Sequence, residues 1–484
     1  MPHLVPDALS YWYLIVQLTF SRNLLPGEPS IMMYLLYDIL LFLAVPLFIP
    51  YFFYRSLTRR RLRKGIVERL GFLSAEKRAC LHGAETLWVH AVSVGETIAV
   101  RPLLMALKKR YPEKKIVLST VTETGRSIAE NLDDVDLCIY FPFDFGFAVR
   151  RMLNAVRPSL IVVVETEIWP NFLRYAHRSG IPTVLANGRI SDTSFGGYLR
   201  FSWAFRPVLA NFAALCMQTE EDARRIIAIG APPRRVHVAK NLKYDIPSIR
   251  VSAETKRSLL DRYCLPEGLP VVTAGSTHRG EEEAVLKACC SLEKDGREFV
   301  LVLVPRHPER AEEVAKIADQ LGVRCVRRSE LDGQSSLLQP GEVLLVDTVG
   351  ELMDIYSISD LVFVGGSLVP VGGHNLLEPV SLAVPVLFGP YMNNFREIEA
   401  LILLHKGGVQ VADSAALTET FRQLLDSPVA RTKLGENGAQ ILSENCGSTD
   451  RHMEIIAGYL SGKDTVMKGS ASSSPNDHGR PGDL

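Results

Sequence analysis

The sequence predicts an α/β protein with two doubly wound, parallel-sheet domains. Its 484 residues are more than one hydrophobic core usually holds. Continuous apolar runs alternate with amphipathic stretches, which is typical of parallel strands covered by helices on both faces. The alternation occurs twice, on either side of a polar, proline-bearing segment at 246–269. We therefore expect one Rossmann-like domain at 55–245, an interdomain linker at 246–269, and a second domain at 270–462.

The amino-terminal region predicts a membrane-anchor helix. Residues 33–54 are almost entirely apolar and include about the 20 residues that a helix needs to cross a bilayer. A basic cluster follows at 55–64, and the positive-inside rule places the rest of the chain in the cytoplasm. We expect a single-pass or monotopic anchor. The alternative, a buried or interfacial helix that does not span, is favoured by Asp38 and two prolines within the segment.

Both ends of the chain are expected to lie outside the folded domains. Residues 1–32 are interpreted as a non-native or flexible extension, with translation starting at Met32 or Met33. Residues 463–484 are rich in Ser, Gly, Pro and Asp and predict a disordered tail.

Composition excludes several functional classes. Lysine plus arginine and aspartate plus glutamate each number 54, so no net positive charge indicates nucleic-acid binding. The 8 cysteines include no CxxC pair, and we expect reduced thiols and no metal site. The chain has no convincing Walker P-loop and no GxGxxG after its first strand, which argues against a dinucleotide dehydrogenase.

The apolar runs place the expected strands. In the first domain they are at 86–92, 115–121, 136–143, 160–167, 183–191 and 214–220, with a helix at 97–112 after the first strand. In the second they are at 270–277, 298–308, 342–351, 359–367 and 384–390. Two such domains facing one another place a ligand cleft between the carboxyl ends of their strands.

Acidic residues stand at two of these strand ends. Glu96 opens the helix after the first strand, where the helix amino terminus favours the anion, which could then accept a proton. Glu165 and Glu167 leave an apolar strand, and period-2 alternation puts them on one face. Such acids are costly to bury unless they are paired or used. The alternatives are a simple helix-start residue for Glu96 and solvated strand-end acids for the other two.

Basic and glycine-rich segments predict an anion site. Lys243, between the two halves, could neutralise a leaving phosphate or a carboxylate, although a surface lysine is the alternative. Arg306 ends a strand and could clamp a phosphate, with His307 contacting the same ligand. The segment GGSLVPVGGHNLLEP at 365–379 offers backbone N–H groups before a helix expected to begin at Asn375. Glu378 lies one turn into that helix, within reach of ribose hydroxyls. A purely structural glycine cluster is the alternative.

Taken together, these segments resemble a known family. HAVSVGE, ETEIWPN, NGRIS, NLKYD, AGSTHRGEE, LVPRHPER, DTVGEL, GGSLVPVGGHNLLEP and FGPYMNNF are similar to signature stretches of bacterial 3-deoxy-D-manno-octulosonic acid (Kdo) transferases, in the same order from Leu36 to Leu460. The resemblance implies a GT-B fold and an inverting glycosyltransferase of lipopolysaccharide core biosynthesis at the inner membrane, with its catalytic domains in the cytoplasm. The donor would be CMP-Kdo and the acceptor the tetraacylated lipid A precursor, lipid IVA. Neither a metal nor a cofactor is expected.

The resemblance also implies residue roles. Glu96 becomes the general base, and Glu165 and Lys243 match residues that support the transition state. The residues that match CMP-binding stretches are Pro305, Arg306, Gly350, Glu351, Leu352, Asn375, Leu376, Leu377 and Glu378. One departure precedes NLKYD, where Ala239 and Lys240 replace the family's usual Thr-Gly. The remaining alternatives are another GT-B nucleotide-sugar transferase or epimerase, and a non-catalytic membrane-bound scaffold.

Overall fold

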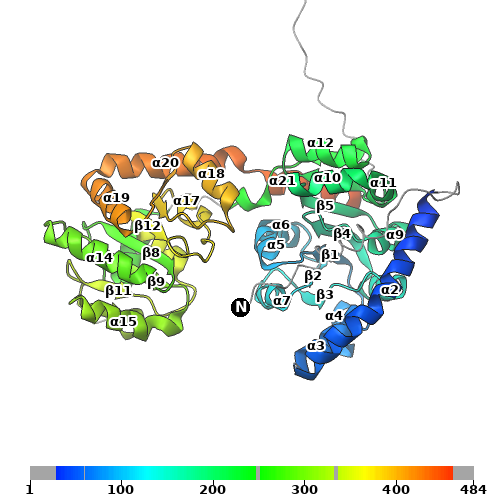
Figure 1. The fold of residues 1–484 in the computed structure, drawn as a ribbon, viewed down its shortest axis with the longest axis horizontal. Coiled ribbons are helices and arrows are strands. Elements are labelled where there is room, and N and C mark those ends of the chain that lie inside the picture. The colour runs from blue at the N-terminus through cyan, green and yellow to red at the C-terminus, as the bar shows by residue number, and fades with distance from the viewer. Residues whose placement is uncertain (1–28, 59, 247–250, 332–335, 462–484) are drawn as a thin grey trace, which may run out of the picture. The chain divides into compact units, whose positions relative to one another are not determined.

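The computed structural model describes residues 29–58, 60–246, 251–331 and 336–461, and the chain forms two compact units. The first unit contains the chain up to Leu242 and from Thr449 onward, and the second runs from Lys243 to Ser448. Each unit has one seven-stranded sheet with helices on both faces (Figure 1). The predicted fold class, two doubly wound domains of the kind found in GT-B enzymes, is confirmed. The predicted tail at 463–484 and most of the extension at 1–32 lie outside the described residues.

The first sheet is entirely parallel, in the order β3-β2-β1-β4-β5-β6-β7. Its strands are β1 (Thr86–His90), β2 (Lys115–Thr120), β3 (Leu137–Tyr140), β4 (Pro158–Val164), β5 (Thr183–Gly188), β6 (Ala214–Met217) and β7 (Val236–Val238). Strand order reverses between β1 and β4, which is where ligands bind in doubly wound folds.

Two apolar clusters cover the two faces of this sheet. Trp88 faces the cluster built with α8, α9, α11 and α12, whereas its neighbours Leu87 and Val89 face the cluster built with α6, α7 and α21 (Ser448–Leu460). The helices of this unit, apart from α2 and α21, are α3 (Arg60–Arg69), α4 (Ala75–Leu81), α5 (Val94–Ala99), α6 (Arg101–Arg110), α7 (Glu123–Ala129), α8 (Gly146–Val156), α9 (Pro170–Arg178), α10 (Asp192–Arg200), α11 (Ser202–Leu209) and α12 (Glu220–Ile229). The predicted helix at 97–112 is therefore two helices, because Pro102 starts a new first turn in α6.

The second sheet repeats the plan in the order β10-β11-β9-β8-β12-β13-β14 and is also parallel. Its strands are β8 (Val271–Thr277), β9 (Val300–Pro305), β10 (Cys325–Arg327), β11 (Val343–Leu345), β12 (Leu361–Val364), β13 (Val386–Phe388) and β14 (Gly408–Gln410). Its α-helices are α13 (Ala253–Arg262), α14 (Glu281–Lys294), α15 (Ala311–Gln320), α16 (Leu352–Ile358), α17 (Leu377–Ser381), α18 (Arg396–Leu404), α19 (Ser414–Asp426) and α20 (Pro428–Asn445). The order reverses between β8 and β12.

The unit boundaries differ from those expected from the sequence. The predicted second domain extended to 462, but from Thr449 onward α21 (Ser448–Leu460) belongs to the first unit. Its Met453 and Ile456 are buried in an apolar cluster of that unit, and its Tyr459 hydroxyl donates to the carbonyl of Ala213. The predicted linker at 246–269 contains α13, whose Leu260 packs in a core cluster of the second unit.

The predicted anchor segment forms α2 (Pro29–Thr58), which packs along the outside of the first unit (Figure 1). Asp38, the charge within the apolar segment, accepts a hydrogen bond from the Asn171 side chain at 2.6 Å. The Tyr37 hydroxyl donates to Asp144 at 2.8 Å, and Tyr34 is buried in the core cluster. Among the described residues, no helix has the length and apolar character needed to cross a membrane, so the predicted spanning helix at 33–54 is not confirmed.

Candidate functional site

Three carboxylates lie at the point where strand order reverses in the first sheet. Glu96 follows β1, and Glu165 and Glu167 follow β4, the neighbouring strand. Each of the two buried acids, Glu96 and Glu167, feels the negative charge of Glu165. The structure therefore brings together the three acids that the sequence placed at strand ends.

Glu96 is held by the loop that precedes it. Its carboxylate accepts hydrogen bonds from the Val92 N–H at 2.7 Å and from the Ser93 hydroxyl at 2.8 Å. Ser93 is also the N-cap of α5, where its hydroxyl oxygen accepts from the Glu96 N–H. This reciprocal cap fixes the side chain, and only 8% of Glu96 is exposed.

The ionisation of Glu96 differs from the sequence-based expectation. We expected the helix amino terminus to favour the anion. Burial, together with the charge of Glu165, instead raises the pKa of Glu96 to about 7, although the contacts with Val92 and Ser93 act in the opposite direction. At neutral pH the carboxyl group is therefore divided between its two protonation states, the condition that suits a group exchanging protons near pH 7.

Glu165 and Glu167 do not share a strand face as expected, because β4 ends at Val164. Glu165 has a φ of +59°, a left-handed conformation that is uncommon for a residue with a side chain and is often found at functional sites. Glu167 is 7% exposed, so it is not a solvated strand-end acid. Burial and the nearby Glu96 and Glu165 raise its pKa to about 8.

The second unit gathers the predicted donor-binding residues at the carboxyl edge of its sheet. Pro305 ends β9, and the Arg306 guanidinium is exposed, with no hydrogen bond or ion pair to any described residue. The Asn375 side chain donates to Glu378 at 3.2 Å and accepts from the Leu377 N–H. Burial raises the pKa of Glu378, while Asn375 and Arg306 oppose that rise. Helix α17 begins at Leu377 with Leu376 as its N-cap, two residues later than predicted.

The segment 350–352 starts α16, which also packs against α17. Gly350 has a φ of +93°, Glu351 is the N-cap, and Leu352 begins the helix. The Glu351 carboxylate is held by Arg328 at 3.0 Å and Arg262 at 3.1 Å. In this structure Glu351 therefore positions the start of α16 through two ion pairs.

Lys243 stands at the boundary between the units. It lies in a short 3-10 helix, Leu242–Tyr244, and is the first residue of the second unit, whereas Glu96 and Glu165 belong to the first. Lys240, at the position where the resemblance implies a glycine, has a φ of +62°. The lysine thus adopts the left-handed backbone that glycine accommodates without strain.

Sequence reasoning missed Glu281, the counterpart of Glu96 in the second unit. It opens the helix after β8, as Glu96 does after β1, and is 1% exposed. Its carboxylate accepts hydrogen bonds from four backbone N–H groups, those of His278, Gly366, Ser367 and Leu368. The GEE that follows the first strand of the second half was the available signal, since GE occupies the same place in the first half.

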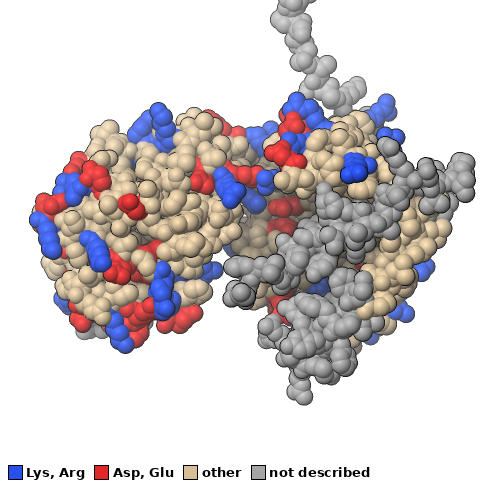
Figure 2. Space-filling view, viewed as in Figure 1, with Lys and Arg blue, Asp and Glu red and all other residues tan. Residues whose placement is uncertain are grey.

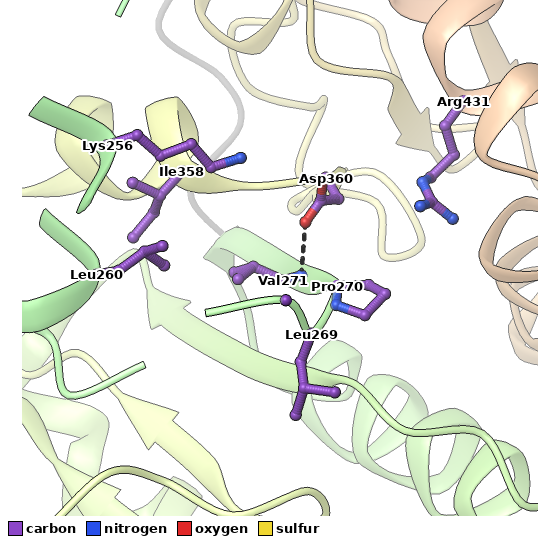
Figure 3. Close-up of a pocket in the computed structure, with 9 residues that line it drawn as sticks. Lys256, Leu260, Leu269, Pro270, Val271, Ile358, Asp360 and Arg431 are labelled. Atoms are coloured by element: carbon purple, nitrogen blue, oxygen red, sulfur yellow. Dashed lines mark hydrogen bonds between the residues drawn. The ribbon is translucent and has the colours of Figure 1, made fainter. Parts of the chain in front are cut away.

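A pocket of about 200 Å³ lies near the amino ends of β8 and β12, away from the carboxyl ends of the strands in the second sheet. Its lining includes Pro270 and Val271 at the amino end of β8, with Lys256 and Arg431 on either side of Asp360 (Figure 3). Asp360 accepts a hydrogen bond from the Val271 N–H at 2.9 Å. Because ligands of doubly wound sheets bind at the carboxyl ends of strands, we do not assign this pocket to the candidate site.

The chain is similar to known proteins over most of its length. Residues 64–246 match the family described as 3-Deoxy-D-manno-octulosonic-acid transferase (kdotransferase). The chain is 34% identical over 428 residues to the 3-deoxy-D-manno-octulosonic acid transferase of Haemophilus influenzae, covering 88% of this chain and 98% of that protein. It is 31% identical to the enzyme of the same name from Bordetella pertussis, over 80% of this chain and 91% of the relative.

Among solved structures, part of the chain is similar to the C-terminal CMP-Kdo binding domain of WaaA from Acinetobacter baumannii. The two are 35% identical, with a TM-score of 0.36, and the match covers 39% of this chain and 96% of that domain. A glycosyltransferase from Rickettsia africae matches 78% of this chain and 99% of its own at 12% identity and a TM-score of 0.49.

Proposed function

The chain belongs to the Kdo transferase family, and from this premise we propose that it transfers Kdo from CMP-Kdo to the lipid A precursor lipid IVA, with inversion at the anomeric carbon. The observation that carries the proposal is Glu96, a buried carboxylate fixed by two hydrogen bonds at the strand-order reversal, with a pKa of about 7. Membership of the family makes the chain a glycosyltransferase of lipopolysaccharide biosynthesis. The acceptor, the stereochemistry and the role of Glu96 are the proposal.

In the proposed reaction a hydroxyl oxygen of the acceptor attacks the anomeric carbon of Kdo. The new C–O bond forms as the bond from that carbon to the CMP phosphate oxygen breaks, and the hydroxyl proton passes to Glu96. The contacts of Glu96 with Val92 and Ser93 orient the carboxylate for this transfer. Glu167, with a pKa of about 8, is mostly protonated at neutral pH and is therefore the weaker candidate for the base.

The donor would be held by the second unit. The exposed Arg306 guanidinium can pair with the phosphate, and together with Lys243 it would stabilise the charge on departing CMP. Glu378, beside Asn375, can accept hydrogen bonds from the ribose hydroxyls. The donor carries only one phosphate, so these groups could offset its charge without a divalent cation, and we propose that no metal or other cofactor is required.

We also propose that α2 rests on the cytoplasmic face of the inner membrane. One side of the helix docks on the first unit through Tyr34 and Asp38. Its other side exposes a row of large apolar residues, Leu35 (57%), Ile39 (54%), Phe42 (59%) and Leu43 (65%). Their i, i+4, i+7, i+8 spacing forms one stripe, as in helices that lie within a bilayer interface. Such a position would bring the first unit to its lipid acceptor.

Vesicle flotation tests this membrane contact. Replacing Leu35, Ile39, Phe42 and Leu43 with serine should abolish co-flotation with anionic vesicles while leaving the circular dichroism spectrum unchanged. Serine at Leu404 and Val429, which are 76% and 80% exposed in the second unit, is the matched control and should float normally. Equal flotation of the two variants would refute the role of α2.

Incubation of the purified chain with CMP-Kdo and lipid IVA tests the function. Mass analysis should show lipid IVA with added Kdo, and CMP should appear in equal amount. The product mass also counts the Kdo residues transferred. Release of UDP from a UDP-sugar without any turnover of CMP-Kdo would indicate another nucleotide-sugar enzyme. No turnover of any donor, with lipid binding retained, would indicate a scaffold.

A further inference from the structure

Two histidines contact one another where strand order reverses in the second sheet. His278 directly follows β8, and His374 lies in the loop after the neighbouring β12. Their Nε2 atoms are 2.9 Å apart, and the two rings are nearly parallel, at 7°. His307, after β9 on the other side of β8, has its ring centroid 5.9 Å from that of His278. Three adjacent strands thus each lead to a histidine.

The surrounding backbone is shaped to hold this histidine pair. The buried Glu281 carboxylate accepts hydrogen bonds from the backbone N–H groups of His278 and Gly366. These two bonds join the loop after β8 to the loop after β12. Gly366 has a φ of +66°, and a Cβ there would lie 3.0 Å from Cδ2 and 3.1 Å from Nε2 of His374. A side chain at position 366 would crowd the His374 ring, so the absence of a Cβ there provides the space for the two rings.

The short contact between the rings requires a proton. Two nitrogen lone pairs would repel at 2.9 Å, so one Nε2 carries a hydrogen that it donates to the other. Within the described residues no group of three or more His, Cys, Asp or Glu side chains could hold a metal ion. The pair is therefore a hydrogen-bonded imidazole dimer, and one further proton would make it a cation.

Burial, helped by nearby positive charges, holds the pair neutral in the absence of a ligand. Burial, followed by the influence of His278, Arg306 and His307, lowers the pKa of His374 to about 4. Burial and the neighbouring cations also lower the pKa of His278. The charged and titratable groups that face the pair from the adjoining elements are Arg306, His307, Arg310, Glu281, Glu282, Glu309 and Glu378. Of the acids, Glu282 is paired with Arg310 at 2.7 Å, and Glu309 lies 3.4 Å from His307.

We propose that His278 and His374 form an anion subsite for the nucleotide-sugar donor, taking up one proton as they bind an anionic oxygen of its phosphodiester or its sugar carboxylate. The proton comes from solvent: an O–H bond of hydronium breaks as a new N–H bond forms on the pair, and no bond of the donor breaks. A bound anion would offset the effects of burial and of the charges at Arg306 and His307, which together disfavour this proton. This inference rests on the proposed function and extends it, because neither histidine belongs to the stretches matched to CMP binding.

Proton uptake and donor affinity test the subsite in the full-length chain. Stopped-flow mixing with a pH indicator in weakly buffered solution at pH 7.5 should detect up to one proton taken up per bound donor. The KM for CMP-Kdo should rise by about tenfold per pH unit between the pKa of the free pair and the higher pKa of the donor-bound pair, and level off above the latter. His374→Asn and His278→Asn should abolish both effects and raise the KM at pH 7 by about tenfold or more. His82→Asn, an exposed histidine in the first unit, is the control and should behave as wild type.

Comparing ligands identifies the anion. Proton uptake with CMP alone would assign the subsite to the phosphate, and uptake only with CMP-Kdo would assign it to the sugar carboxylate. Normal turnover with no proton uptake, or an unchanged KM profile in both histidine variants, would refute the histidine subsite and leave the proposed function standing. No turnover of CMP-Kdo by wild type would refute the proposed function, and with it the donor that this subsite is proposed to bind.

Discussion

Replacing Glu96 with glutamine should remove the general base and keep the fold. Glutamine has the same shape, and its amide oxygen can still accept from the Val92 N–H while the Ser93 hydroxyl turns to accept from the amide nitrogen. We therefore expect kcat to fall by about 10²–10⁴, the usual contribution of a general base. The KM for CMP-Kdo should change little, because the donor is assigned to the second unit.

The dependence of kcat on pH gives a second, independent test of Glu96 as the base. A base acts only when ionised, so the rate should rise with pH through about 7, the pKa of Glu96, and then level off. At pH 6 about a tenth of the molecules would carry the anion, and kcat should be about a tenth of its plateau. Glu165→Gln removes a charge that raises this pKa, so the ascending limb should move to lower pH, whatever happens to the plateau.

Initial rates of CMP release with lipid IVA, measured from pH 5.5 to 8.5, test both expectations. Glu220→Gln is the matched control, because Glu220 also opens a helix after a strand of the first sheet but is exposed. The reasoning is wrong if Glu96→Gln retains more than about a tenth of the wild-type kcat, since a general base contributes at least about 10². It is also wrong if Glu165→Gln leaves the ascending limb unmoved.

Three further predictions concern stability, each measured by urea unfolding. Glu281→Ala should lower the free energy of unfolding by about 3 kcal/mol or more, because four backbone N–H groups lose their acceptor. Glu283→Ala on the same helix is the control and should lower the free energy of unfolding by only about 0.5 kcal/mol. Lys240→Gly should be more stable than Lys240→Ala by up to about 1 kcal/mol, because both variants lose the lysine side chain but only glycine relieves the left-handed strain; equal stability of the two variants would refute this account. Gly275→Ala should cost about 1–3 kcal/mol, since its Cβ would lie 2.1 Å from the Tyr356 hydroxyl oxygen, and Tyr356→Phe should recover part of that loss.

Much of the fold could be predicted because its strands are buried on both faces. Every residue of β1 and β9 is buried; β9 is a continuous apolar run, and β1 has polar residues only at its two ends, Thr86 and His90. The edge strands β7, β10 and β14 escaped detection because most of their residues are only partly buried or exposed, whereas β11 and β13, which are also three residues long, are fully buried. The packing of α21 on the first unit could not be predicted, because an apolar helix face does not specify which of two cores will bury it.

The strand-end positions of the candidate residues could be predicted, but the raised pKa of Glu96 could not. Glu96, Glu165 and Arg306 could be placed because strand ends are visible in the sequence and the carboxyl ends of parallel strands share one edge. The pKa of Glu96 depends on burial and on the charge of Glu165, 69 positions along the chain, and both arise only on folding. The contact between His278 and His374 likewise depends on the adjacency of β8 and β12.

The route of the chain also has a consequence for building variants of this protein. The polypeptide crosses from one unit to the other between Leu242 and Lys243 and returns between Ser448 and Thr449, so the second unit is an insertion within the first. Figure 2 shows acidic and basic side chains interspersed over the described surface of that inserted unit. A stop codon after Ser448 would therefore remove Met453 and Ile456 from the apolar core of the first unit, which carries Glu96. The truncation would damage the amino-terminal unit, although it deletes only carboxyl-terminal residues. Excising 243–448 as one fragment would leave every strand of the second sheet in a single continuous piece.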